Sequence, residues 1–287
     1  MGTTDVALDL IRRARTAEQI RAALEAAAPG ERLHQVVVDR FDELARSPRR
    51  DPTGALRAQL LRALRPMITV ADRSRAETAL LTYEFGFGPQ GENCAGLRAA
   101  GLLALADLDP DAAESYAVRL LGDAEHTEPM SGEPALTAVR YLAARGSTAP
   151  IYLYALAGGT QEECLAEALR ALSTLPAPLV RQLAERLSQS DDDIALVGLF
   201  DLLTTHAEPA AFAGFVRDWA LKTSRFEVLN FAAAQILASR LEPLLQALRE
   251  AAALSGDERR KALLSGVLGP ADPAARGPDA RSRPGSA

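Results

Sequence analysis

The feature that most constrains the fold is an internal repeat. Residue pairs whose first member is aliphatic recur at Leu97-Arg98, Val139-Arg140, Leu169-Arg170, Leu199-Phe200 and Leu229-Asn230. Their second members are 42, 30, 30 and 30 residues apart. Upstream, GALRAQLLRAL resembles GLRAAGLLAL and places Arg57 41 residues before the Arg of the first pair. A nearly fixed period of this length indicates a stack of similar supersecondary units.

An acidic residue precedes each of these anchor pairs at a nearly constant distance. The interval is seven residues for Glu133, Glu163 and Asp193 and six residues for Glu92 and Asp51. Acidic side chains favour helix N-termini, where they complement the partial positive charge of the helix dipole. Turn segments with Pro follow at DLDPDA (107–112), RGSTAP (145–150), TLPAP (174–178) and HAEPA (206–210). Because Pro suits the first turn of a following helix, each unit is predicted to be a pair of helices.

The composition also favours helices over strands. Aromatic residues make up only 5% of the chain, so Ala and Leu, both strong helix formers, must build the core. Long alternations of β-branched and polar residues do not occur. We therefore predict an all-α chain with one domain over residues 1–268, in which residues 1–49 form capping helices. Residues 269–287 contain no large aliphatic or aromatic side chain and are predicted to be disordered.

Paired helices at this period resemble the HEAT repeat. The closest matches are LRAAGLLALADLDPDAA and AVRYLAARGSTAP, and the resemblance covers roughly residues 50–255. The resemblance implies a right-handed α-solenoid of stacked antiparallel helix pairs, with about 12–15 helices. HEAT repeats carry an acid and an Arg that tie neighbouring units together. By that resemblance Arg98, Arg140 and Arg170 are expected to stack, partly buried, each near an acid. The two C-terminal anchors lack Arg, so packing must hold those units.

The stretch YEFGFGPQGENCAGLR contains a G-x-G-x-x-G pattern at Gly86, Gly88 and Gly91. A dinucleotide-binding loop of this kind needs a preceding strand and a surrounding βαβ unit. Here the preceding RAETALLTY predicts a helix, and Glu92 would repel a phosphate at the start of the next helix. We therefore expect Glu92 to be a helix-start acid of the repeat and no nucleotide to bind here.

Charge and cysteine usage narrow the partners. The formal net charge of −6 argues against a general nucleic-acid binder. The two cysteines and three histidines show no zinc spacing, so we expect no metal and no cofactor. No apolar run reaches the ~18 residues of a membrane span, and the first residues lack a signal-peptide core. We expect a soluble, cytoplasmic monomer without membrane contact.

Two joints between units carry insertions. The units around Arg98 are 41 and 42 residues long instead of 30, and FGFGPQGEN and DAEHTEPMSGEP (123–134) account for the excess. In a solenoid such joints lie on one edge, where insertions often form the binding face. We predict a partner-binding rim with a neighbouring concave surface, composed of Phe85, Phe87, His126, Met130, Tyr116 and Arg119. In the alternative, the two Phe side chains plug the end of a helix pair, and the His and Met lie on a mobile surface loop.

Other conspicuous residues have simpler interpretations beside a functional one. Asp191-Asp192-Asp193 is expected to cap a helix rather than bind a metal. Cys94 is expected to pack in the core rather than act as a nucleophile. Trp219 is expected in the core. The basic segment 46–66 is expected to be a solvated face, with an acidic partner or nucleic acid as its alternative.

We predict a non-enzymatic protein–protein interaction scaffold or adaptor that binds a protein or peptide, because no catalytic constellation is visible. The alternative is a HEAT-fold enzyme that acts at the concave face, since some DNA glycosylases and some phycobilin lyases resemble this architecture. A glycosylase would need a basic concave groove, and the acidic balance of the C-terminal two-thirds argues against one.

Overall fold

Most of the chain that the structure describes is helical. The computed structural model describes residues 3–84, 94–159 and 161–269. These residues form sixteen α-helices and no strand, which confirms the all-α class and exceeds the expected number of helices by one. The helices are α1 (Thr3–Arg13), α2 (Ala17–Ala26), α3 (Glu31–Arg46), α4 (Ala55–Leu64), α5 (Arg73–Leu80), α6 (Ala95–Ala106), α7 (Pro110–Gly122), α8 (Ala135–Arg145), α9 (Thr148–Leu156), α10 (Glu162–Arg170), α11 (Ala177–Leu187), α12 (Asp193–Thr205), α13 (Ala213–Lys222), α14 (Phe226–Ala238), α15 (Glu242–Leu254) and α16 (Glu258–Leu268).

The helices divide between two compact units. Unit 1 is Met1–Leu175 and holds α1 to α10, and unit 2 is Pro176–Ala287 and holds α11 to α16. The prediction of a single domain over residues 1–268 stays a prediction. The expected disordered tail lies, after residue 269, outside the described residues.

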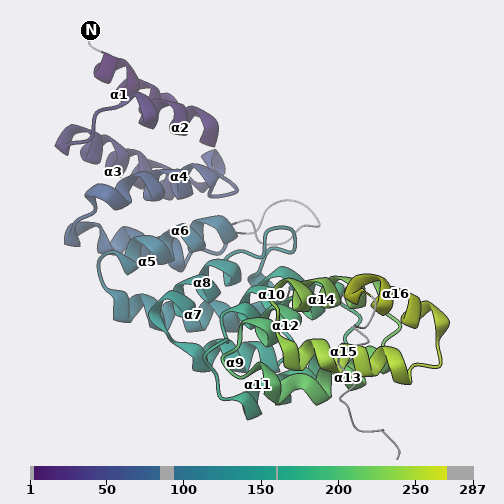
Figure 1. Cartoon of the computed structure of the whole chain (residues 1–287). Helices are drawn as coiled ribbons and strands as arrows, with labels where there is room; N and C mark the ends of the chain where they lie inside the picture. Colours follow the sequence, from purple (N-terminus) through teal and green to yellow (C-terminus); the bar gives the residue numbers. More distant parts are fainter. Residues whose placement is uncertain (1–2, 85–93, 160, 270–287) are drawn as a thin grey trace, which may run out of the picture. The chain divides into compact units, whose positions relative to one another are not determined.

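Unit 1 has two layers of helices (Figure 1). In one layer α2, α4, α6, α8 and α10 pack in that order, each against the next. The other layer contains α1 against α3 and α7 against α9, and the layers join through pairs such as α3 with α4 and α5 with α6. In the layer of α2, α4, α6, α8 and α10, each helix therefore packs against the equivalent helix of the next repeat, as the 30- to 42-residue period requires.

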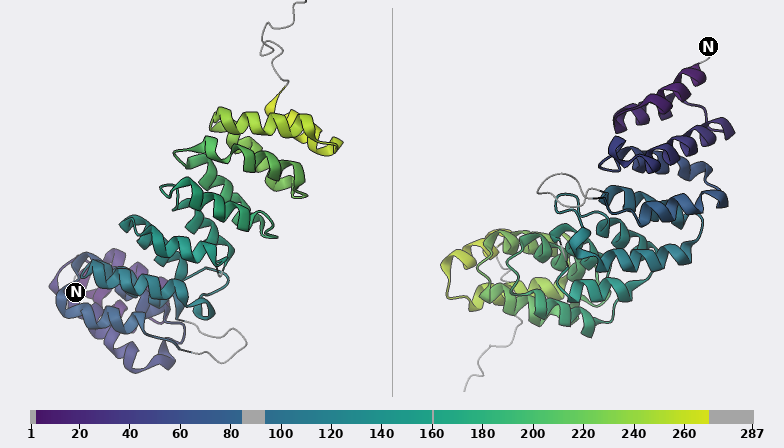
Figure 2. Two further views of the ribbon diagram at one scale, coloured as in Figure 1. Left: turned by 90° about the horizontal axis from the view of Figure 1, so that it is seen from below. Right: turned by 180° about the vertical axis from the view of Figure 1, so that it is seen from behind.

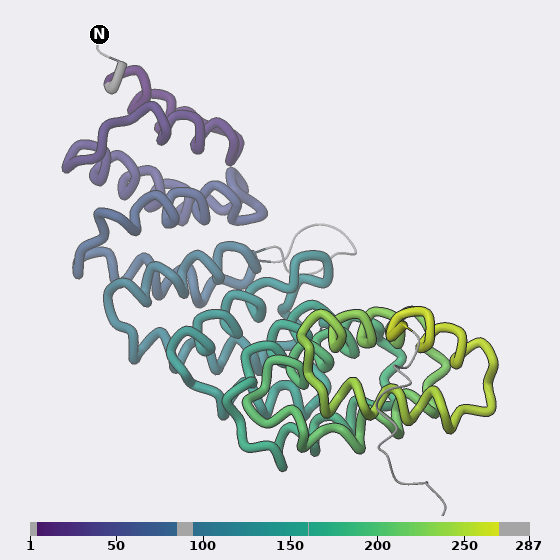
Figure 3. Tube along the Cα trace, viewed as in Figure 1, coloured from purple at the N-terminus to yellow at the C-terminus, as the bar shows by residue number. Residues whose placement is uncertain are grey.

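Unit 2 follows the same rule with six helices. α12, α14 and α16 form one layer, and α11, α13 and α15 form the other. The trace in Figure 3 runs back and forth between these layers, and the two additional views in Figure 2 show the same succession of helices. Successive helices within a layer of this unit start 29 to 36 residues apart, close to the 30-residue step that the sequence predicts.

The predicted helix starts and turns are confirmed where they fall on described residues. Pro110 is the first residue of α7, and the Asp109 carboxylate accepts a hydrogen bond from a backbone N–H of the first turn. Gly146 ends α8 with a left-handed φ of 73°, which glycine adopts without strain. Asp51 accepts hydrogen bonds from two backbone N–H groups at the start of α4, both 3.0 Å long. The acid at this position is therefore a helix cap, as its spacing from the anchor predicts.

Two residues show how the helices pack, a glycine at a close helix crossing and a tryptophan in the core. Gly101 lies where α6 crosses α5, and a Cβ atom there would be 2.9 Å from both the Ala76 carbonyl oxygen and the Leu80 backbone nitrogen. The crossing thus requires a residue without a side chain. In unit 2 Trp219 is buried against Phe200, with ring centroids 4.6 Å apart, which confirms its predicted core position.

The Arg anchors do not share one environment. Arg57 and Arg98 are buried, but the side chains of Arg140 and Arg170 are 59% and 44% exposed, so the expectation of partial burial is wrong for these two residues. Arg140 and Arg170 both contact Glu167, at 2.8 and 3.6 Å. The expected proximity to an acid is confirmed for this pair. The two guanidinium groups on α8 and α10 therefore share this carboxylate at the protein surface, where they are exposed to solvent.

Candidate functional site

The predicted rim lies only partly within the described residues. Phe85 and Phe87 fall outside them. Arg119 and His126 both contact Tyr83, an aromatic residue that follows α5 and was not among the predicted rim residues. An Arg119 guanidinium nitrogen donates a 3.2 Å hydrogen bond to the Tyr83 hydroxyl, and the His126 ring packs edge-on against the Tyr83 ring with centroids 4.8 Å apart.

The other two predicted rim residues lie outside this contact cluster. Met130 is 90% exposed on the segment that connects α7 to α8. Tyr116 is half-buried on α7, one turn before Arg119. The structure therefore brings together two of the six predicted residues, and the joint role of all six stays a prediction.

Tyr83 is a structural donor rather than a base. Its hydroxyl donates a hydrogen bond to the Asp123 carboxylate, and the Arg98 guanidinium lies 4.3 Å from its ring centroid. Burial, together with the hydrogen bond and charge of Asp123, raises the pKa of Tyr83, although the charges of Arg119 and Arg98 oppose this. The phenol therefore stays protonated at neutral pH. It joins the end of α5 to α6, α7 and the segment 123–134.

That segment is anchored along its length. The backbone N–H of Glu128 donates to the Glu133 carbonyl, and the N–H of Gly132 donates to the Glu128 carbonyl, both at 2.8 Å. The Cys164 thiol on α10 donates to the Gly132 carbonyl over 3.2 Å. Residues 123–134 are therefore hydrogen-bonded within the segment and to α10, while Met130 is exposed. The alternative of a mobile surface loop stays a prediction.

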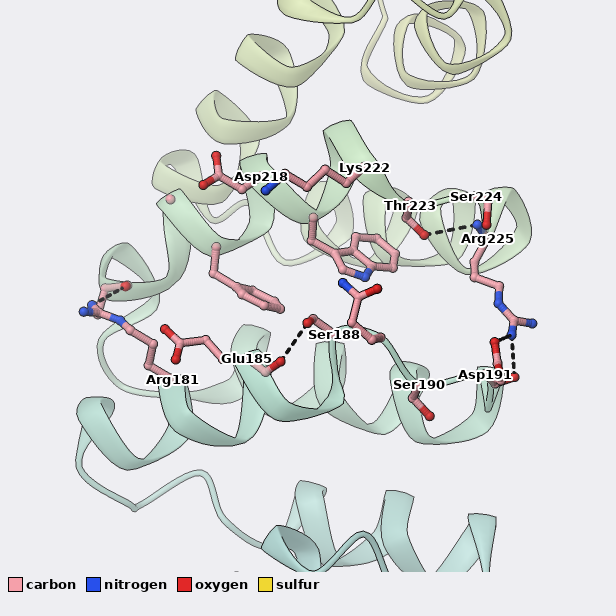
Figure 4. Close-up of a pocket in the computed structure, with 15 residues that line it drawn as sticks. Arg181, Glu185, Ser188, Ser190, Asp191, Asp218, Lys222, Thr223, Ser224 and Arg225 are labelled. Carbon is pink, nitrogen blue, oxygen red and sulfur yellow. Dashed lines mark hydrogen bonds and ion pairs between the residues drawn. The ribbon is translucent and has the colours of Figure 1, made fainter.

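The clearest cavity in the described residues lies elsewhere, in unit 2. It is a groove of about 690 Å³ between α11 and α13, within the ~300–1,000 Å³ typical of ligand sites. Figure 4 shows polar and charged side chains along both walls. We call it the α11–α13 groove, and the residues used below are Arg181, Glu185, Gln189, Trp219, Lys222 and Arg225.

Most charges at the ends of the groove are already engaged. At one end Arg225 pairs with Asp191 at 2.7 Å and with Asp193 at 3.2 Å (Figure 4). At the other end a guanidinium nitrogen of Arg181 donates to the Ala211 carbonyl over 2.9 Å. These contacts fix the ends of the groove and leave little charge there for a ligand.

Two charges in the groove are not engaged. Glu185 lies on the α11 wall and Lys222 on the opposite α13 wall (Figure 4). Within the described ranges neither side chain forms an ion pair. Both are exposed, so each can meet an opposite charge from outside the protein.

Comparison of this chain with family models, with curated proteins and with solved structures found no match. The residues themselves must therefore carry the functional argument. Among the described residues no group of three or more His, Cys, Asp or Glu side chains is placed to hold a metal ion. The helices of that same part of the chain are all too short or too polar to cross a bilayer.

The candidate nucleophiles and metal ligands have structural roles. Burial and nearby Glu133 raise the pKa of the Cys164 thiol to about 12, so it is not a thiolate at neutral pH. Cys94 is buried at the start of α6. In the run of three acids, Asp192 caps α12 and its two neighbours bind Arg225, which agrees with the capping interpretation.

The sequence prediction missed the α11–α13 groove because it looked for sites at insertions. The groove lies where the repeat step is regular, and its walls come from helices about one repeat apart. Two rare residues mark it: Trp219 is the sole tryptophan, and Lys222, one of two lysines, lies three residues later on the same helix. The spacing places both on one face of α13.

Proposed function

We propose that this protein is a non-enzymatic protein-binding scaffold built from HEAT-like helix pairs. The observation that carries the proposal is the α11–α13 groove, an open polar cavity with Glu185 on one wall and Lys222 on the other, neither of them in an ion pair within the described residues. Paired opposite charges on the walls of an open groove favour a ligand that carries both signs, which is typical of a polypeptide. The partner is a protein or peptide, and the protein acts as a monomer in the cytoplasm.

The solenoid architecture is part of this proposal. Its support is the alternation of layers inside each unit, where α2, α4, α6, α8 and α10 pack in succession and α11, α13 and α15 do the same. Stacked units of this kind bury a continuous core and expose extended surfaces. We also propose the HEAT-like repeat and the partner-binding rim. The rim is composed of Phe85, Phe87, His126, Met130, Tyr116 and Arg119.

Nucleic acid is the weaker partner for the basic segment 46–66. Three of its arginines pair with carboxylates inside unit 1: Arg50 with Glu43, Arg57 with Asp51 and Glu84, and Arg65 with Asp107. Guanidinium groups bound in this way release few counterions from a phosphate backbone. This segment therefore offers less positive charge than its sequence indicates.

The enzyme alternative has little support in the side-chain chemistry. His34 contacts the Asp72 carboxylate at 2.9 Å, and His206 accepts a hydrogen bond from the Glu208 backbone and packs against Phe212. These imidazoles therefore serve local structure.

The test is reconstitution with a purified partner. The full chain is immobilised and exposed to extract, a captured protein is expressed separately, and the two are mixed and measured by light scattering and calorimetry. A defined stoichiometry with a micromolar or tighter Kd, of the order seen in specific complexes, supports the proposal. An unrelated all-α protein of similar net charge is the matched control. Recovery of a small molecule or nucleic acid instead of a protein would favour the enzyme alternative.

A further inference from the structure

The α11–α13 groove contains an aromatic N–H donor that has no acceptor in the described part of the chain. Trp219 is 6% exposed and lines the groove, and buried indole N–H groups normally have a hydrogen-bond partner. Its Nε1 forms no hydrogen bond within residues 3–84, 94–159 and 161–269. Because this nitrogen is unpaired and yet not fully buried, it belongs to the small part of Trp219 that solvent reaches. The indole N–H is therefore directed to the groove, where a ligand can accept its hydrogen bond.

Further exposed polar groups lie along the same groove. Lys222, one turn after Trp219 on α13, has three N–H donors and no ion pair inside the described part of the chain. On the facing side Gln189, just after α11, offers an amide, and Glu185 offers a carboxylate. A ligand that fits must supply hydrogen-bond acceptors and donors in the centre, a negative group toward α13 and a positive group toward α11.

We propose that this groove binds an extended peptide segment of a partner protein, with an acidic side chain at Lys222, a basic side chain at Glu185 and a backbone carbonyl at the Trp219 indole. The inference rests on the proposed function and specifies its binding site. An extended segment fits this donor best, because its backbone carbonyls are not committed to hydrogen bonds within the segment, whereas most carbonyls of a helix already accept one. An extended peptide keeps its carbonyl and N–H groups available, as in other recognition modes that use the main chain.

The geometry of an extended chain sets the spacing of the charges. Successive side chains point to opposite sides of an extended segment, so residues at odd separation face opposite walls. Glu185 and Lys222 lie on opposite walls (Figure 4). The acidic and basic residues of the bound segment are therefore adjacent or three positions apart. A segment with both charges at positions i and i+2 would direct them to the same wall.

The probe is a set of 12-residue peptides selected from a random phage library on the full-length protein. Because Trp219 is the sole tryptophan, its fluorescence reports occupancy of the groove directly. The leading synthetic peptide is expected to shift the Trp219 emission and to carry an acidic and a basic residue at odd separation. Moving the acidic and the basic residue of that peptide to positions i and i+2 should weaken binding about tenfold, which corresponds to a loss of about 1.4 kcal/mol.

Matched variants locate the site. Lys222→Gln should weaken peptide binding about tenfold. Lys261→Gln, which removes the chain's second lysine, on α16, should leave peptide binding unchanged. Trp219→Phe removes the N–H but keeps an aromatic ring against Phe200, and a similar loss is expected by anisotropy of a labelled peptide. If Trp219→Phe unfolds the protein, the exposed Lys222 variant still decides the result.

The outcomes separate the site from the function. Peptides that bind without a change in Trp219 emission, and equally well to Lys222→Gln, would overturn the groove proposal and leave the scaffold function standing. Failure to select any peptide, together with no reconstituted partner, would overturn both. A change in Trp219 emission on removal of residues 270–287 alone would assign the groove to the chain's own tail and overturn the partner segment.

Discussion

The buried guanidinium of Arg57 is the most informative single residue to remove. It is 2% exposed and contacts two carboxylates, Asp51 at 2.9 Å and Glu84 at 2.9 Å through each of two nitrogens. Burial alone would lower the pKa of Arg57, but its hydrogen bonds to Glu84 and Asp51 outweigh burial and raise it. Arg57→Met keeps most of the alkyl volume and leaves the buried Asp51 without its counter-ion.

The expected loss of stability follows from that stranded charge. Removing one partner of a buried pair costs about 3–5 kcal/mol. A loss of about 4 kcal/mol lowers the melting temperature of a protein of this size by roughly 8–16 °C. The matched control is Arg140→Met. Its 59% exposed side chain forms a surface pair with Glu167, so the expected cost is about 0–1 kcal/mol.

Urea unfolding followed by circular dichroism measures both variants. The double variant Arg57→Met with Asp51→Asn should recover part of the loss, because it removes the carboxylate charge that the single variant strands. Equal losses for Arg57→Met and Arg140→Met, or no recovery in the double variant, would refute the argument that burial decides how much each Arg anchor contributes to stability.

Four further predictions follow from single contacts. Burial favours the neutral form of Asp72, but hydrogen bonds from His34 and Thr69 lower its pKa below the ordinary 3.8. Its stabilisation is therefore present above the unfolded value and is lost as the pH falls through the lower pKa of the folded state. The melting temperatures of wild type and Asp72→Asn should differ at neutral pH and converge as the pH falls below about 3.8. Cys94 and Cys164 should resist a thiol reagent at pH 8 in the native protein, and both should react in urea. Gly101→Ala should lower the melting temperature although Ala is the better helix former, because its Cβ meets backbone atoms of α5 at 2.9 Å. Deleting residues 124–131 should lower the melting temperature clearly, because the deletion removes the His126 carbonyl that accepts a hydrogen bond from the buried Arg98 guanidinium.

Each of these has a result that would contradict it. A constant difference between the Asp72 variant and wild type across that pH range would show that its carboxylate does not carry a linked proton. Rapid labelling of either cysteine in the native protein would contradict its burial. An increase in melting temperature for Gly101→Ala, or an unchanged one for the deletion, would show that those contacts are not as tight as their distances indicate.

The helices were predictable because their signals are local. Asp51 and Asp109 act on the first turns of their own helices, and Gly146 adopts a left-handed φ at the end of α8. A repeat step then places each helix beside its counterpart one unit later. Information of this kind needs only the spacing of residues along one helix or one repeat.

Burial and the groove were not predictable in the same way. Arg57 and Arg140 occupy equivalent anchor positions, yet one is buried and the other is exposed. What separates them is the neighbouring helix and turn, which the repeat pattern does not specify. The α11–α13 groove likewise depends on how far two helices about one repeat apart separate at their surface, and only its rare Trp219 and Lys222 were visible in the sequence.

The contacts of Arg98 change how the insertion 123–134 is understood. From the sequence alone, the insertion is predicted to contribute His126 and Met130 to a partner-binding rim. Arg98 is completely buried, and a buried guanidinium needs acceptors for its donors. One nitrogen donates to the Thr82 carbonyl at 3.1 Å and another to the His126 carbonyl at 2.6 Å, inside the insertion itself. A joint without these extra residues would lack that carbonyl. The insertion therefore has a structural use of its own, and its length alone is not evidence of a binding site. The exposed Met130 is the part of it that this use leaves unexplained.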